Sequence, residues 1–215
     1  PGSVIGGTGF GINATTGGAG DITVTAFDGG IVSGVTGINA GASGTGTVTV
    51  TTSGQVTSTG GDAIQASSNS GALSVTVGTG GAIANGGDGV DADSVTGTVT
   101  VTSNGAISAT GNGISADSAG AVLVTVNADI TATGAAGVDA ESTGSSSTVI
   151  IADGVTIDPQ DFGVSTVAAT DATISGGVNV TLDVNDTDAD GVSIGAYAES
   201  TAAADTGAGD PAVEI

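Results

Sequence analysis

Short runs in which Val or Ile alternates with Thr recur along the chain, as at 48–51 and 99–102. Alternation with a period of two places the branched side chains on one face of a strand and the hydroxyls on the other. Residues branched at Cβ also favour an extended backbone. The pattern therefore predicts an all-β chain whose strands each bury one face.

A four-residue motif returns along the chain: Gly, then Ile or Val, a polar residue, and Ala. Its branched residue advances by 24 to 28 positions from copy to copy, and such a fixed period is typical of a solenoid. The polar position is predicted to face water, and the small Ala to turn inward at a tight corner. The eight copies begin at Gly11, Gly37, Ala63, Gly89, Gly113, Gly137, Gly163 and Gly191.

Two further strands are expected after each motif. The second is predicted at 22–24, 48–50, 75–77, 99–101, 124–126 and 149–151, and the third is centred on Ile31, Val56, Ile83, Ile107, Ile130 and Val155. Three short strands per coil, joined by Gly, Asn and Ser corners, wind into a parallel β-helix. We predict about eight coils of 24–28 residues in one domain, 1–200, followed by an acidic irregular tail or cap at 201–215.

The charge of the chain narrows its function. It has 22 Asp and Glu residues but no Lys, Arg or His, which gives a formal net charge of -22. Binding to a nucleic-acid backbone needs cationic side chains and is excluded. The most common catalytic bases and Schiff-base residues are also missing. We therefore expect a non-enzymatic protein with no small-molecule substrate, no required cofactor and no membrane span.

One acidic segment resembles the start of a calcium-binding loop. Residues 186–191 read Asp-Thr-Asp-Ala-Asp-Gly, and alternating carboxylates before a Gly turn supply the oxygen ligands that Ca²⁺ prefers. Tyr197 stands where the closing Glu of such a loop is expected, so an acidic solvated turn is the alternative interpretation. The candidate calcium ligands are Asp186, Asp188, Asp190, Val192 and Glu199.

Two other surfaces suggest a ligand. Threonines of the second strand are predicted to form an outward ladder that resembles an ice-binding surface, although Thr is also a good strand residue. Leu123 and Ile150 interrupt this array. Asp91 shares a strand face with Asp93 and a column with Asp139, which leaves a polysaccharide hydrolase as a remote alternative. The ladder consists of Thr23, Thr49, Thr76, Thr100 and Thr125.

The repeated units, such as GGDAIQASSNSGALSVTV followed by GTGGAIANGGDGVDADSVTGTVTV, resemble the passenger repeats of bacterial autotransporter adhesins and related surface β-helix proteins. The resemblance covers residues 8 to about 195 and implies a secreted, right-handed parallel β-helix on a Gram-negative cell, used for adhesion, aggregation or as a stalk. The chain departs from that family in lacking Lys and Arg and in having no translocator barrel after residue 215. We therefore expect an excised passenger segment or a small self-contained relative.

The main functional prediction is an extracellular structural or adhesive β-solenoid at the bacterial cell surface: an adhesin segment, a stalk or a self-assembling fibre subunit. Its expected partners are further copies of itself or a host or cell surface. Because each copy is strongly negative, assembly should need salt or calcium to reduce the repulsion. A calcium- or ice-binding β-helix module is the alternative.

Overall fold

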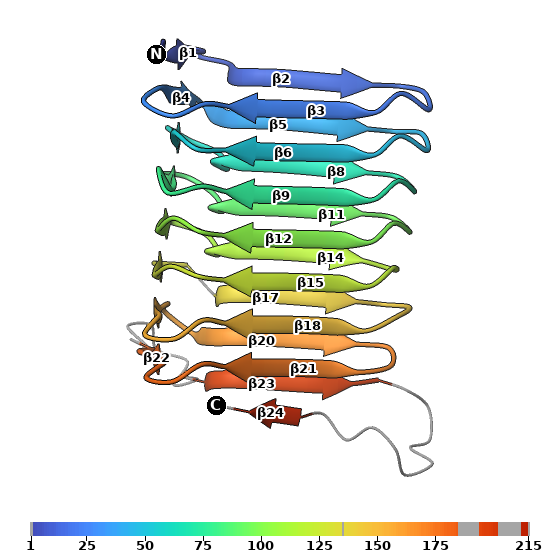
Figure 1. The fold of residues 1–215 in the computed structure, drawn as a ribbon, viewed down its shortest axis with the longest axis vertical. Helices are drawn as coiled ribbons and strands as arrows, with labels where there is room; N and C mark the ends of the chain where they lie inside the picture. Colours follow the sequence, from blue (N-terminus) through green and yellow to red (C-terminus); the bar gives the residue numbers. More distant parts are fainter. Residues whose placement is uncertain (1, 135, 185–193, 202–211, 215) are drawn as a thin grey trace.

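The strands wind into a parallel β-solenoid (Figure 1). This computed structural model describes residues 2–134, 136–184, 194–201 and 212–214. Successive strands pass from sheet A to sheet B to sheet C and back, so each coil supplies one strand to each of three eight-stranded sheets. Seven turns separate the first strand of a sheet from its last. The predicted all-β solenoid with three strands per coil is confirmed.

Sheet A holds the shortest strands, all parallel. They are β1 (Val4–Ile5), β4 (Ile31–Gly34), β7 (Gln55–Ser58), β10 (Ala82–Ala84), β13 (Ile107–Ala109), β16 (Ile130–Ala132), β19 (Thr156–Asp158) and β22 (Thr181–Leu182).

Sheet B carries the repeated motif. Its strands are β2 (Phe10–Thr16), β5 (Thr36–Ala42), β8 (Ile64–Ser68), β11 (Val90–Ser94), β14 (Ile114–Ser118), β17 (Ala136–Ser142), β20 (Phe162–Ala168) and β23 (Ile194–Ser200).

Sheet C contains the Val-Thr runs. Its strands are β3 (Ile22–Ala26), β6 (Val48–Thr52), β9 (Leu73–Val77), β12 (Val99–Ser103), β15 (Val122–Val126), β18 (Ser147–Ile151), β21 (Ala172–Gly176) and β24 (Ala212–Glu214). β24 comes from the segment 201–215 and pairs with β21. The described residues form no helix, so none of them builds a helix able to cross a membrane.

The core is a stack of Val, Ile and Ala from all three sheets, each lying on its equivalent in the next coil. In sheet B the branched residue of the motif is fully buried from Ile38 to Val164. The residue before it must be Gly in most coils, because there is no room for a Cβ atom at this position. A Cβ atom at Gly113 would collide with the side chain of Ile130 and approach the carbonyl of Gly137 too closely. The repeated Gly therefore lets sheets A and B pack closely at this corner.

The register corrects the eighth copy of the motif. We expected it at Gly191-Val192-Ser193-Ile194, but β23 pairs Ala196 with Val164 and Ile194 with Phe162. The eighth copy is therefore Gly195-Ala196-Tyr197-Ala198. The longer connection between β22 and β23 shifts the motif by four residues from its expected place.

Two of the third strands are also shifted, by one residue. Val32 and Ala82 lie in the inward column with Val56 and Ile107, whereas we had centred these strands on Ile31 and Ile83. Ile31 is exposed and Ile83 is partly exposed as a result. A slip of one residue exchanges the two faces of a strand. In β19 the inward position belongs to Ile157, although Val155 just before the strand is also buried.

Candidate functional site

The outer face of sheet B concentrates carboxylates in two neighbouring columns. Asp91 pairs with Ser115 and Ser115 with Asp139, so the first column places two carboxylates two coils apart, at about 10 Å. This is the arrangement that the sequence predicts for Asp91, Asp93 and Asp139. The second column is denser, because Asp93, Asp117 and Glu141 occupy successive strands. We call these residues the acidic face; its members are Asp91, Asp93, Asp117, Asp139 and Glu141.

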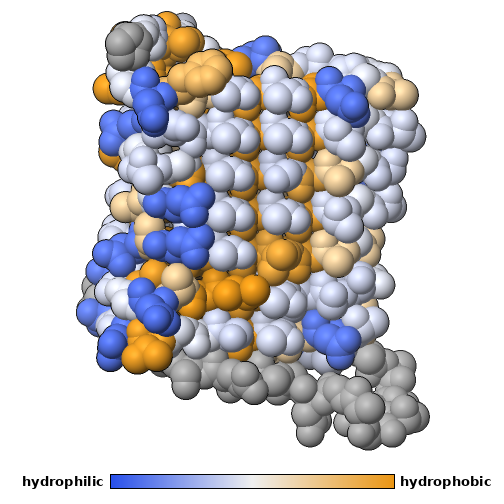
Figure 2. Space-filling view, viewed as in Figure 1, coloured by the Kyte–Doolittle hydropathy of each residue, from blue (hydrophilic) through white to orange (hydrophobic). Residues whose placement is uncertain are grey.

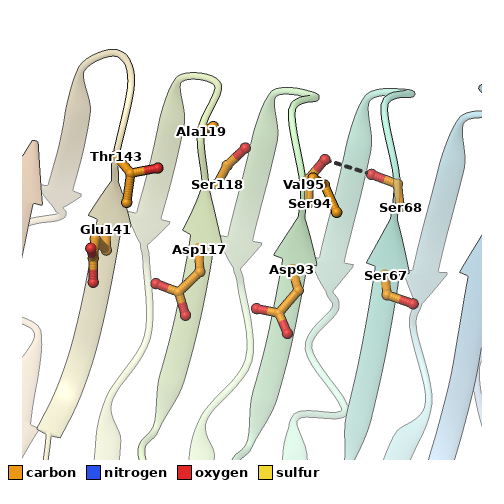
Figure 3. Close-up of a pocket in the computed structure, with 10 residues that line it drawn as sticks. All are labelled: Ser67, Ser68, Asp93, Ser94, Val95, Asp117, Ser118, Ala119, Glu141 and Thr143. Carbon is orange, nitrogen blue, oxygen red and sulfur yellow. Dashed lines mark hydrogen bonds between the residues drawn. The ribbon is translucent and has the colours of Figure 1, made fainter. Parts of the chain in front are cut away.

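A shallow groove of about 410 Å³ lies where these strands end and turn toward sheet C. Figure 3 shows Asp93, Asp117 and Glu141 on successive strands along it, with the hydroxyls of Ser94, Ser118 and Thr143 above them. Its most exposed apolar side chain is Val95, which is 62% exposed. The groove is lined by Ser67, Ser68, Asp93, Ser94, Val95, Asp117, Ser118, Ala119, Glu141 and Thr143.

Inward-facing serines hold this corner in place. The Ser68 hydroxyl donates a hydrogen bond to the carbonyl of Gly71 at 2.8 Å, and its Oγ lies 2.8 Å from that of Ser94. Ser94 and Ser118 accept bonds from the backbone N–H groups of Gly97 and Gly120 in the turns that follow. Buried hydroxyls with such partners stabilise a corner whose backbone groups would otherwise be unsatisfied. The groove therefore has a rigid floor.

The pKa values of the four Asp residues of the acidic face, Asp91, Asp93, Asp117 and Asp139, are raised, with burial as the largest cause. Burial, together with the nearby carboxylates of Asp93 and Asp62, raises the pKa of Asp91 to about 7. Burial, with Asp93 and Asp139 nearby, likewise raises the pKa of Asp117 to about 6. Gln65 and Ser115 donate weak hydrogen bonds of 3.4 Å to Asp91 and Asp117 and oppose these shifts. No cation in the chain offsets them.

A second row of polar side chains supports the turn that enters sheet B. The backbone N–H of Asp88 donates to Asp62 Oδ1 at 2.8 Å, and the N–H of Asn112 donates to Asp88 Oδ1 at 2.6 Å. Asn112 continues the row by accepting from the N–H of Ala136. These side chains therefore link one coil to the next. Burial nevertheless raises the pKa of Asp88, since it outweighs the bond from Asn112.

The chemistry open to the acidic face follows from its composition. Neighbouring carboxyl groups with raised pKa values can share protons near neutral pH. The described part of the chain contains no group of three carboxylate, His or Cys side chains placed to hold a metal ion. A glycosidase would need one carboxyl group as acid and another as base or nucleophile. Asp91 and Asp139 lie about 10 Å apart, just beyond the roughly 6.5–9.5 Å of an inverting pair, and both face outward on one sheet with no opposite wall.

The predicted calcium loop falls mostly outside the described residues. Four of its five candidate ligands lie outside the described residues: Asp186, Asp188, Asp190 and Val192. Only Glu199 lies within them. It is exposed on β23, where the Tyr197 hydroxyl donates a hydrogen bond to it. This bond raises the pKa of Tyr197. Calcium binding stays a prediction.

The threonines of sheet C form two outward columns rather than the single ladder that we predicted. Thr49 pairs with Ser74, and Thr76 stands in the next column, opposite Thr51. Thr125 also belongs to this second column. Both columns are visible on the face toward the viewer in Figure 2, with an apolar interruption. The first contains Thr23, Thr49, Ser74, Thr100, Leu123, Thr148 and Thr173; the second contains Thr25, Thr51, Thr76, Thr102, Thr125, Ile150 and Ser175.

Sequence reasoning did not single out Asp117 and Glu141. The signal was present, because the motif extends to Ala, an acidic residue and Ser in three consecutive copies, at 92–94, 116–118 and 140–142. The acidic residue and Asp91 or Asp139 are separated by one inward Ala, so both face outward.

Comparisons of the chain with protein-family models, with curated proteins and with solved structures found no match. The resemblance to autotransporter passenger repeats therefore stays a hypothesis based on the repeat pattern.

Proposed function

We propose that the protein is a non-enzymatic structural or adhesive β-solenoid, an adhesin segment or stalk that works outside the cell. One observation carries the proposal: the coils repeat a constant register, so the protein is a regular stack of coils along one axis (Figure 1). Each inner coil is hydrogen-bonded to the coils on both sides through three ladders. Such a body holds surface side chains at fixed intervals of about 4.8 Å along its axis.

The groove on sheet B is the surface that best suits an adhesive role. A second hollow of about 620 Å³, lined by hydroxyl and amide groups from Thr15 to Asn69, shares Ser67, Ser68 and Val95 with the acidic groove. Together they cross the ends of six strands, β2 to β17. An extended molecule lying along the solenoid axis would first contact the neutral hollow and then the acidic groove. Val95 lies between the two.

The described core consists of side chains that pack against one another, with no charged group among its buried residues. Its side chains are Val, Ile, Leu and Ala, and its buried hydroxyls are largely bonded to the corner backbone or to one another. This supports a scaffold whose function lies on its outer faces. Turnover of a polysaccharide by the folded protein, abolished in Asp91→Asn, would contradict the non-enzymatic part of the proposal.

Adhesion can be tested by displaying the protein on a bacterial strain that neither aggregates nor adheres. We expect faster settling of the displaying cells, or their attachment to a cell monolayer. Val95→Asp should reduce it severalfold. Val178→Asp is the matched control, because Val178 is similarly exposed, at 67%, but lies outside the groove. Behaviour identical to that of the bare strain would contradict the proposal, as would equal loss in both variants.

A further inference from the structure

The outer face of sheet C differs from the rest of the surface because it is made almost entirely of hydroxyls. We call the fourteen outward positions of the two columns on β3 to β21 the hydroxyl face. Ten of them are Thr and two are Ser; Leu123 and Ile150 are the exceptions. No carboxylate occupies any of these positions, although the chain has 22 of them.

The hydroxyls of this face do not stabilise the fold through hydrogen bonds. No hydrogen bond joins them to another described residue, whereas the buried Ser94, Ser103 and Ser118 all bond to the corner backbone. Side chains on sheet B also bond along their column, as Asn39 does to Asn13 at 2.8 Å. The hydroxyl face is therefore left to interact with water.

The hydroxyl face is flat because nearly identical buried residues lie beneath it on every strand. A single buried residue separates the two columns on every strand, and it is Val in six of seven strands and Ile174 in β21. The register runs from β3 to β21 over five residues per strand without a bulge. Hydroxyls therefore repeat at about 4.8 Å between coils and at about 6.6 Å along a strand.

We propose that the hydroxyl face binds ordered water and, through it, the surface of ice. Water molecules on the prism faces of hexagonal ice repeat at one shorter and one longer spacing in perpendicular directions, and both are similar to the two spacings of these hydroxyls. Regularly spaced Thr hydroxyls can anchor such a layer, while the Thr methyl groups limit competing hydration. Charged groups would order water around themselves instead, and the face contains none.

The regular part of the face is at its N-terminal end. The strands β3, β6, β9 and β12 each present two hydroxyls, whereas Leu123 replaces one on β15 and Ile150, 41% exposed, replaces one on β18. These two apolar residues stand on the adjacent strands β15 and β18 and interrupt the array of hydroxyls. The first four strands therefore provide most of the proposed contact with ice.

The experiment uses ice itself as the probe. Thermal hysteresis, crystal shaping and retention of the labelled protein on a growing ice hemisphere are measured for the wild type and three variants. Thr100→Tyr places a bulky side chain in the regular part of the face, and we expect severalfold loss of hysteresis and of retention. Leu123→Thr/Ile150→Thr extends the array, and we expect a gain in both readouts.

Asn39→Tyr is the matched control, because it introduces the same side chain on the outer face of sheet B. Tyr197 already occupies the equivalent position in β23. This variant should bind ice as the wild type does, and unfolding temperatures should show that all variants fold. Absence of crystal shaping in both the wild type and the double Thr variant would overturn the proposal. Reversible pairing of two copies through this face, without ice retention, would also overturn it.

Discussion

Asp93 and Asp117 occupy the same position on the adjacent strands β11 and β14, and Glu141 follows at that position on β17. Like charges directly opposite each other destabilise a sheet. The chain has no Lys, Arg or His to neutralise them. Sheet C, by contrast, has no charged residue in its two outward columns from β3 to β21. The solenoid therefore separates a strained acidic face from a neutral hydroxyl face.

Lowering the pH from about 8 to about 5 should stabilise the protein. The raised pKa values of Asp91, about 7, and Asp117, about 6, mean that the folded state binds protons more readily than the unfolded chain. The destabilisation is fully present above these values and disappears as the pH falls through them toward the unfolded value of 3.8. We expect a gain of about 1–2 kcal/mol after allowing for solvent screening.

Urea unfolding at several pH values measures this gain. Asp91→Asn/Asp117→Asn should be more stable than the wild type at pH 8, and its stability should change less with pH. The control Asp171→Asn removes an exposed charge at the edge of sheet C and should keep the wild-type profile. A wild-type stability that falls steadily from pH 8 to pH 5 would show that the acidic face does not behave as described.

Asp88 should tolerate Asn better than Ala. Its Oδ1 accepts a hydrogen bond from the N–H of Asn112, and Asn112 performs the same task one coil later with an amide oxygen. Asp88→Asn keeps an acceptor and removes a charge whose pKa burial raises, so stability at pH 8 should be unchanged or higher. Asp88→Ala should lose about 1–2 kcal/mol because the Asn112 N–H loses its partner. Equal unfolding midpoints for the two variants would argue against this row of bonds.

The Gly column and the inward column of sheet A should be energetically coupled. Gly113→Ala should cost about 1–3 kcal/mol, because the added Cβ meets the side chain of Ile130. In the one coil where this column already has Ala, at Ala63, the inward residue of the next sheet-A strand is Ala82. Gly113→Ala/Ile130→Ala should therefore lose less stability than the sum of the single variants. Strict additivity in urea unfolding would contradict this packing.

The repeat motif was sufficient to predict the fold, because its Gly, branched, polar and Ala positions each have a physical reason to recur. It could not place the strands of sheet C. The sequence Val75-Thr76-Val77 matches Val48-Thr49-Val50, but the structure pairs Val48 with Leu73. A slip of two residues keeps every inward side chain inward, so alternation alone cannot detect it. The turns between sheets B and C vary in length, and this variation decides the register.

The eighth coil shows the same limit. Gly191-Val192 matches the motif better than Gly195-Ala196, yet Gly195 takes the place opposite Gly163. The large apolar residue before the Gly, Phe162 in one coil and Ile194 in the next, was the missed signal. The acidic face was only partly predicted, since raised pKa values depend on burial and on neighbours in other coils.

The hydroxyl face depends on the register of the strands in sheet C. Disulfide formation tests this register most directly. Because the chain has no Cys, any disulfide must form between introduced thiols. Thr49→Cys/Ser74→Cys puts the two thiols on paired positions of β6 and β9, about 4.8 Å apart at the backbone, whereas Thr49→Cys/Thr76→Cys puts them about 8 Å apart on the diagonal. Bridging needs Cα atoms within about 7 Å. After mild oxidation of the folded protein, mass spectrometry should find an intramolecular disulfide in the first variant and free thiols in the second. The opposite result would contradict the register and, with it, the two aligned columns of hydroxyls.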